Sequence, residues 1–100
     1  MPGRVLTASR VRVPAGAESE YLALAGSLAV RLAESGWRVW VFRRRDAPDQ
    51  LLEFRERRAG PVGKGDPEAE RLDRRMRELA RYREDDILWD EVQLPSARET

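Results

Sequence analysis

The spacing of hydrophobic and polar residues predicts a strand and then a helix in the first third of the chain. Val5–Val13 has Val, Thr or Ser at every second position, with arginines among the residues between them, and Pro14 ends this predicted strand. Between Ala17 and Ser35 apolar residues recur every three or four positions, as on one face of an amphipathic helix. Gly36 is the expected left-handed stop after that helix.

Two strands joined by a tight turn are expected next. Trp37–Arg44 is rich in β-branched and aromatic residues, and the turn residues at 46–49 lead into Gln50–Arg57 as its hairpin partner. Gly and Pro dominate positions 59–66, which we expect to form a flexible loop.

The last third of the chain predicts a second helix and a final strand. Asp66 is a plausible N-cap with Pro67 at the first helical position, and the helix is expected to run to Arg81 or Arg83. Ile87–Leu94 is the expected last strand, and 95–100 is expected to be a frayed tail.

This order of elements predicts a single domain over residues 1–100, with an ordered core at about 4–94. The fold class is α+β, a ferredoxin-like βαββαβ sandwich with two helices on one face of a four-stranded antiparallel sheet. The other face of the sheet is then left without cover from the same chain.

Apolar residues on both sides of the predicted second strand suggest what covers that face. One side carries Trp40 and Phe42, and the other carries Trp37, Val39 and Val41. Because a monomer rarely exposes a contiguous apolar patch, we expect a homodimer whose sheets stack into an α/β barrel with a lumen. The expected interface residues are Trp37, Val39, Val41, Ile87 and Trp89.

Composition excludes several classes of active site. The chain has no cysteine, histidine or asparagine. It therefore lacks thiolate and imidazole ligands for metals, disulfides, thiol nucleophiles and any serine–histidine pair. We expect no metal site and no cofactor.

The charges nearly cancel, with 19 basic and 18 acidic residues for a net charge of +1. Such a balance argues against a strong phosphate footprint, so nucleic acid is not an expected partner. The longest apolar runs span only four or five residues, and the N-terminus lacks the apolar stretch of a signal peptide. We expect a soluble, cytoplasmic protein with no membrane partner.

Several short motifs resemble the dimeric α/β-barrel superfamily. They are Val-Arg-Val-Pro-Ala-Gly at 11–16, Tyr21 opening the first helix, Glu-Ser-Gly at 34–36 ending it, and Leu-Glu-Phe-Arg-Glu at 52–56. In element order the likeness covers Val5–Leu94 and is strongest to the antibiotic biosynthesis monooxygenase-like group. It implies a two-fold dimer with small-molecule pockets between sheet and helices or in the lumen.

The same group includes cofactor-free oxygenases of aromatic polyketides and haem-degrading enzymes. The haem-degrading members use asparagine, tryptophan and histidine, and this chain lacks the first and the last. Oxygenase members use tyrosine, tryptophan and arginine in the pocket, for which this chain offers Tyr21, Tyr82 and three tryptophans, Trp37, Trp40 and Trp89. Tyr21 lies at a core position of its helix, where packing is the simpler role.

The candidate ligand-binding residues follow from which side of the sheet each one faces. If Val11, Val13, Leu52 and Phe54 pack on the helices, a set of charged residues shares the open side with two tryptophans. The set comprises Arg10, Arg12, Glu53 and Arg55, with Trp37 and Trp89. Two interpretations stay open: an ion-pair network at the dimer interface, or a pocket whose arginines hold a ligand carboxylate or phenolate while the tryptophans stack on its ring.

Three functions are compatible with these patterns. The leading hypothesis is a dimeric barrel that binds a small, partly aromatic or anionic molecule, as a cofactor-independent monooxygenase-like enzyme or without catalysis. The alternative is a non-enzymatic interaction or regulatory module whose barrel is filled with side chains, because few groups titrate near neutrality. A third reading is an RNA-binding domain that uses the open sheet.

Overall fold

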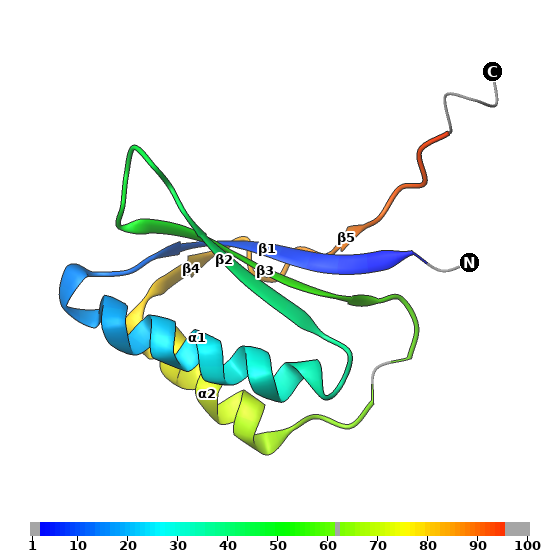
Figure 1. Ribbon diagram of the computed structural model, residues 1–100, viewed down its shortest axis with the longest axis horizontal. Coiled ribbons are helices and arrows are strands. Elements are labelled where there is room, and N and C mark those ends of the chain that lie inside the picture. The colour runs from blue at the N-terminus through cyan, green and yellow to red at the C-terminus, as the bar shows by residue number, and fades with distance from the viewer. Residues whose placement is uncertain (1–2, 62, 96–100) are drawn as a thin grey trace.

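Two helices cover one face of an antiparallel sheet in the computed structural model, which describes residues 3–61 and 63–95 (Figure 1). A 3₁₀ turn at Ala15–Ala17 precedes the first helix. The helices are α1 (Glu18–Ala33) and α2 (Pro67–Leu79), and the strands are β1 (Arg4–Arg12), β2 (Arg38–Arg43), β3 (Gln50–Arg58), β4 (Arg81–Arg83) and β5 (Trp89–Asp90).

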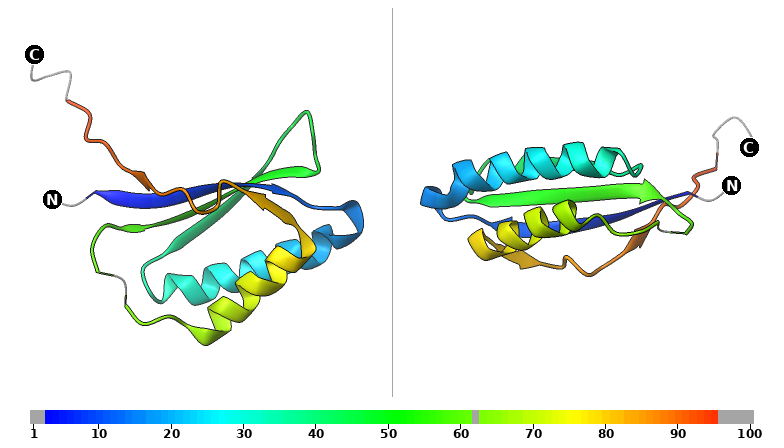
Figure 2. Two further views of the ribbon diagram at one scale, coloured as in Figure 1. Left: turned by 180° about the vertical axis from the view of Figure 1, so that it is seen from behind. Right: turned by 90° about the horizontal axis from the view of Figure 1, so that it is seen from below.

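The strand order is β2-β3-β1-β4, and β5 also pairs with β1, so β1 and β3 form the centre of the sheet. Both helices lie on the same side, and no helix of the described residues lies over the opposite side (Figure 2). The molecule is therefore a small α+β domain, as predicted, and its arrangement is compatible with a ferredoxin-like fold.

The expected ends of α1 and the expected start of α2 are confirmed. Gly36 follows α1 with φ at +83°, the left-handed conformation that glycine adopts without strain. Asp66 caps α2, because its Oδ1 accepts hydrogen bonds from the backbone N–H groups of Glu68 at 2.9 Å and Ala69 at 3.4 Å. Arg31 of α1 donates to the same carboxylate at 2.9 Å, so the cap also ties the two helices together.

The predicted end of the second helix, at Arg81 or Arg83, lies two to four residues too far along the chain. α2 stops at Leu79 because Ala80 adopts an extended conformation and the next three residues pair with the edge of β1 as β4. This change of direction buries Ala80 and places Tyr82 against the core. The burial of these side chains and the hydrogen bonds between β4 and β1 take the place of the backbone hydrogen bonds of a further helical turn.

The predicted last strand, Ile87–Leu94, is also wrong in its extent. Only Trp89 and Asp90 pair with β1, and 91–95 form no strand. β4 and β5 pair with the same edge of β1 and are separated by an irregular segment. Arg83 stands opposite Arg10, and Trp89 stands opposite Leu6. Five residues, 84–88, therefore connect the two strands where β1 has only three, 7–9. Glu84 takes up the surplus with a positive φ of 63°.

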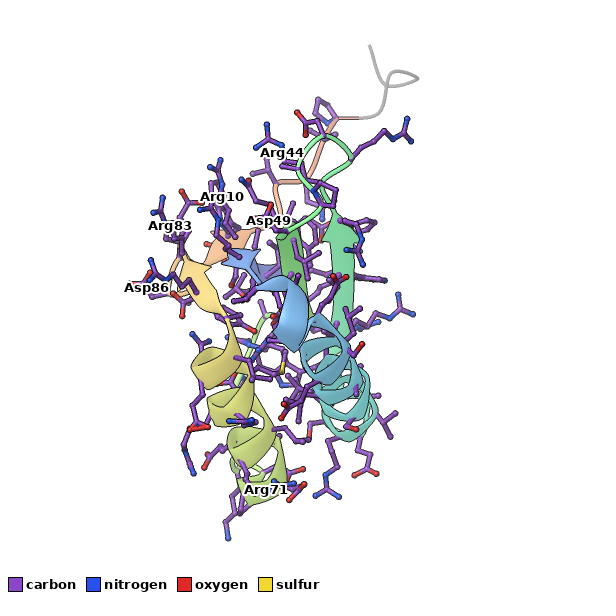
Figure 3. All side chains as sticks on the ribbon, turned by 90° about the vertical axis from the view of Figure 1, so that its left-hand side faces the viewer. Arg10, Arg44, Asp49, Arg71, Arg83 and Asp86 are labelled. Carbon is purple, nitrogen blue, oxygen red and sulfur yellow. The ribbon has the colours of Figure 1, made fainter. Side chains whose placement is uncertain are left out.

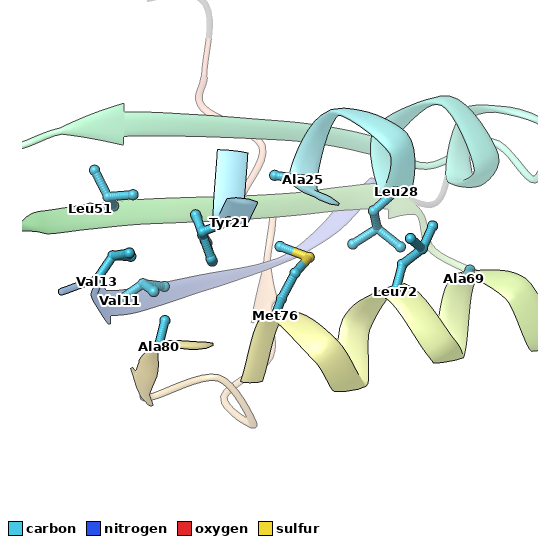
Figure 4. Close-up of a cluster of buried hydrophobic side chains, with 10 residues drawn as sticks. All are labelled: Val11, Val13, Tyr21, Ala25, Leu28, Leu51, Ala69, Leu72, Met76 and Ala80. Carbon is cyan, nitrogen blue, oxygen red and sulfur yellow. The ribbon is translucent and has the colours of Figure 1, made fainter. Parts of the chain in front are cut away.

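The core lies between the sheet and the helices (Figure 4). Met76 and Tyr21 are fully buried at its centre. The whole buried cluster is Val11, Val13, Tyr21, Ala25, Leu28, Leu51, Ala69, Leu72, Met76 and Ala80.

The register of β3 overturns the predicted faces of that strand. Val11 of β1 stands opposite Leu51, and Ser9 stands opposite Glu53, so the odd-numbered residues of β3 point to the helices. Leu51 and Glu53 are 4% and 1% exposed. Leu52 and Phe54, expected on the helix side, lie on the other face instead.

β2 is reversed for the same reason. Val39 and Val41 stand opposite Arg55 and Glu53, which places both valines on the helix side, and Val41 packs against the core. The expectation that Val39 and Val41 form an exposed interface is therefore wrong. Trp40 and Phe42 occupy the uncovered face in their place, at 39% and 56% exposure.

Candidate functional site

The uncovered face of the sheet, called the open face below, carries several large apolar side chains. Phe42 and Phe54 make an edge-to-face pair with ring centroids 5.6 Å apart. Trp40 lies opposite Phe54 on the neighbouring strand, and Trp89 lies opposite Leu6 at the other edge and is 54% exposed. The open face is therefore apolar across several strands, although the residues that form it differ from those predicted.

A hollow of about 810 Å³ lies between the sheet and the two helices, where α1 ends and α2 begins. We call it the helix–sheet cleft. Its apolar lining includes Leu28, Leu32 and Ala69, and Trp37 stands beside them. Residues 59–61 and 63–65 border it on the loop side. A hollow of this size lies within the range of small-molecule sites.

Charged side chains of both signs line the helix–sheet cleft: Arg55, Arg57, Arg58 and Lys64 are basic, and Asp66, Glu70 and Asp73 are acidic. The Arg57 guanidinium carbon lies 5.5 Å from the centroid of the Trp37 ring, a cation–π distance. In the described part of the chain its hydrogen bonds go to backbone carbonyls, those of Arg58 at 3.1 Å and Gly60 at 3.4 Å. Arg55, in contrast, is held by two carboxylates: it pairs with Glu53, and its Nη2 donates to Asp73 at 2.6 Å.

Behind Arg55 lies a buried cluster of three hydrogen-bonding side chains. Both Tyr21 and Tyr82 donate to Oε2 of Glu53 at 2.7 Å, and the two phenol oxygens are 3.2 Å apart. We call this the tyrosine–glutamate cluster. Burial, and then the neighbouring carboxylate, raise the pKa of each tyrosine well above its ordinary value. Both tyrosines therefore stay protonated donors and cannot serve as bases near neutral pH.

A chain of ion pairs continues from this cluster to the surface of α2. Asp73 accepts from Arg55 and, at 3.0 Å, from Arg77, which also pairs with Asp85 and stacks 4.5 Å above the Tyr82 ring. Burial raises the pKa of Asp73, but attraction to Arg55 and the hydrogen bond from Arg77 outweigh it and hold that pKa below its usual range. The charges next to the core are thus compensated in place.

A second hollow, of about 500 Å³, lies at the end of the sheet near the β2–β3 hairpin. We call it the arginine hollow, since five arginines contribute to its wall together with Gln50, Leu52 and the neighbouring strand residues. The arginines are Arg10, Arg12, Arg44, Arg81 and Arg83. Figure 3 shows Arg10, Arg44 and Arg83 gathered at this end, and Arg71 at the far end of α2.

The predicted site residues therefore divide among three places. Trp37 and Arg55 meet in the helix–sheet cleft, with Glu53 buried behind Arg55. The expectation that Glu53 and Arg55 face the open side is wrong. Arg10 and Arg12 do lie on the open face, and Trp89 stands there at the opposite end of β1.

Several residues of these sites were not singled out from the sequence. Arg57 is one of them, although it continues the alternation of Glu53 and Arg55 along the strand. Arg81 and Arg83 were assigned to the end of the second helix or the loop after it. An alternating Arg-Tyr-Arg at 81–83 was the signal for a short strand.

Comparisons with protein-family models, with curated proteins and with solved structures gave no match to this chain. Among the described residues, no helix has both the length and the apolar character needed to cross a membrane. Nor do three or more acidic side chains come together there as a metal site would require.

Proposed function

We propose that this protein is a homodimer that binds a small molecule bearing an aromatic ring and an anionic group, and that the helix–sheet cleft is the binding site. The observation that carries the proposal is the pairing of Trp37 with Arg57 beside an apolar lining. An indole ring and a guanidinium next to each other offer stacking and charge to the same ligand.

The roles of the two arginines differ. Arg57 has its hydrogen bonds to carbonyl oxygens, so its charge is available to a carboxylate or phenolate of a ligand. Arg55 is compensated by Glu53 and Asp73, which keeps it in place as part of the wall. Leu28, Leu32 and Ala69 would take up the apolar part of the ligand, whose burial favours binding.

The open face supports the homodimer. Trp40, Phe42 and Trp89 are exposed on this face, and Phe54 packs against Phe42 there. A second copy of this chain is the occupant that best fits a face of this kind, because two-fold symmetry brings the same apolar patch against it. This is the sheet-to-sheet pairing that the resemblance to the dimeric α/β barrels implies.

Binding of a planar aromatic acid tests the cleft. Isothermal titration with 2-naphthoate should give one site per chain, and Arg57→Ala should weaken the affinity by about tenfold, the effect of losing one charge-assisted contact. Arg74→Ala, an exposed arginine on α2 outside the cleft lining, is the matched control and should bind as the unmodified protein does.

Two outcomes of this titration would overturn the cleft assignment, and a second assay separates the functional classes. Equal loss in Arg57→Ala and Arg74→Ala, or no binding of naphthoate and of its hydroxylated analogues, would overturn the cleft assignment. Where the ligand does bind, oxygen consumption by the complex separates the two functional classes. Consumption favours the monooxygenase-like enzyme, and binding without consumption favours the non-enzymatic module.

A further inference from the structure

The arginine hollow contains an arrangement of charge that the fold does not need. β1 and β4 pair so that Arg10 stands opposite Arg83 and Arg12 stands opposite Arg81. Directly opposed side chains on antiparallel strands lie within about 5.5 Å at Cβ, and like charges in that position destabilise the pairing. The two pairs are separated only by the inward-facing pair of Val11 and Tyr82, so all four arginines start from one square of backbone positions on the open face.

The counter-charges nearby compensate this square only in part. Arg10 and Arg12 each have one carboxylate, Glu84 and Asp49, and both contacts are long, at 3.7 Å. Within residues 3–61 and 63–95, Arg81 and Arg83 have no ion pair at all. Arg44 of the hairpin also borders the hollow, and its carboxylate is Asp46.

The shape around the square limits what can neutralise it. The β2–β3 hairpin rises from the sheet on the side away from the helices (Figure 1). Arg44 and Gln50 therefore stand beside the four strand arginines, around a hollow of about 500 Å³. Arginines that β1, β4 and the hairpin bring to one hollow suit an anion with several oxygens, because each arginine can donate two parallel hydrogen bonds.

We propose that the arginine hollow is a binding site for a diphosphate group, either free or as part of a nucleotide. Several guanidinium groups match the multiple negative charge of a diphosphate. A ligand with a single carboxylate would leave most of these arginines without a counter-charge. The site lies on the open face, opposite the helix–sheet cleft, so the proposal does not depend on what the cleft binds. It does require that the proposed dimer leaves the hairpin end of the open face accessible to the anion.

Calorimetry and thermal unfolding with pyrophosphate test this site. One pyrophosphate per chain should bind and raise the melting temperature more than sodium chloride of equal ionic strength does. Arg81→Ala and Arg83→Ala should each weaken binding by about tenfold. Both variants should stay folded, since each removes a like-charge contact at an exposed position. Arg45→Ala, next to Arg44 but not part of the wall, is the control and should bind normally.

Two further arms identify the source of the group and the alternatives. ADP binding more tightly than pyrophosphate would support a nucleotide, and equal affinity would support the free anion. An effect no larger than that of sodium chloride, or full binding by both variants, would overturn the proposal. Binding of oligothymidylate without binding of pyrophosphate would overturn it in favour of nucleic acid. Loss of the dimer in the variants, with no response to pyrophosphate, would make the hollow a contact between copies.

Discussion

The tyrosine–glutamate cluster predicts how this protein responds to alkaline pH. The chain has two tyrosines, and both donate to the same buried carboxylate. Burial next to that negative charge raises their pKa above the ordinary value of about 10. In the folded state they therefore keep protons that the unfolded chain releases above pH 10, and stability that is fully present below pH 10 falls as the pH rises.

The slope of this loss follows from the number of protons. Each tyrosine that ionises only in the unfolded chain lowers the free energy of unfolding by about 1.4 kcal/mol per pH unit, so the pair lowers it by about 2.7 kcal/mol per unit. A domain of this size has about 5–15 kcal/mol in total, so unfolding should follow within a few pH units.

Ultraviolet absorbance of tyrosinate measures the effect directly, because no other tyrosine contributes. Both tyrosines should ionise in one cooperative step that coincides with the loss of circular dichroism, above pH 10. Tyr82→Phe should halve the absorbance change and flatten the slope, with Tyr21 still silent in the folded state. Ionisation of either tyrosine near pH 10 while the fold persists would refute the buried hydrogen bonds to Glu53.

Three further predictions concern stability. Glu53→Gln should cost about 3–5 kcal/mol in urea unfolding, because it leaves buried donors without their charged acceptor; a loss below about 1 kcal/mol would contradict the geometry. Met76→Ala should cost about 2–5 kcal/mol, whereas the exposed Leu22→Ala should stay within about 0.5 kcal/mol, and equal effects would place Met76 outside the core. The hydrogen bond from Arg31 holds the pKa of Asp66 below its usual range. The stability that this cap contributes is therefore present above about pH 4 and is lost as the pH falls further. Asp66→Asn should flatten the fall of the unfolding free energy below about pH 4, and an unchanged fall would contradict the ion pair.

The sequence predicts the elements better than the faces of the strands. Periodicity and caps locate both helices and the first strands, because Gly36 and Asp66 act locally. The face of β3 depends on its partners: Glu53 is buried only because α1 and β4 each bring a tyrosine hydroxyl to it. No pattern within β3 contains that information, and an alternation rule places the two leucines and the phenylalanine on the wrong sides.

For the candidate sites, the sequence predicts which nearby residues lie together but not which face of the sheet they occupy or which distant residues join them. Trp37 and Arg55 were expected together and are found together, but in the helix–sheet cleft and not on the open face. Arg10 and Arg12 were expected on the open face and lie there. Their partners Arg81 and Arg83 join them only through a register that connects β1 to the end of the chain, which no local spacing reveals.

Sedimentation equilibrium across a dilution series is the most direct test of the central claim, that a second copy covers the open face. We expect a mass twice the 11.5 kDa of one chain, and a shift to the single-chain mass in Phe42→Arg with the fold intact by circular dichroism. A single-chain mass at every concentration of the unmodified protein would contradict the dimer and leave the apolar open face to a different partner.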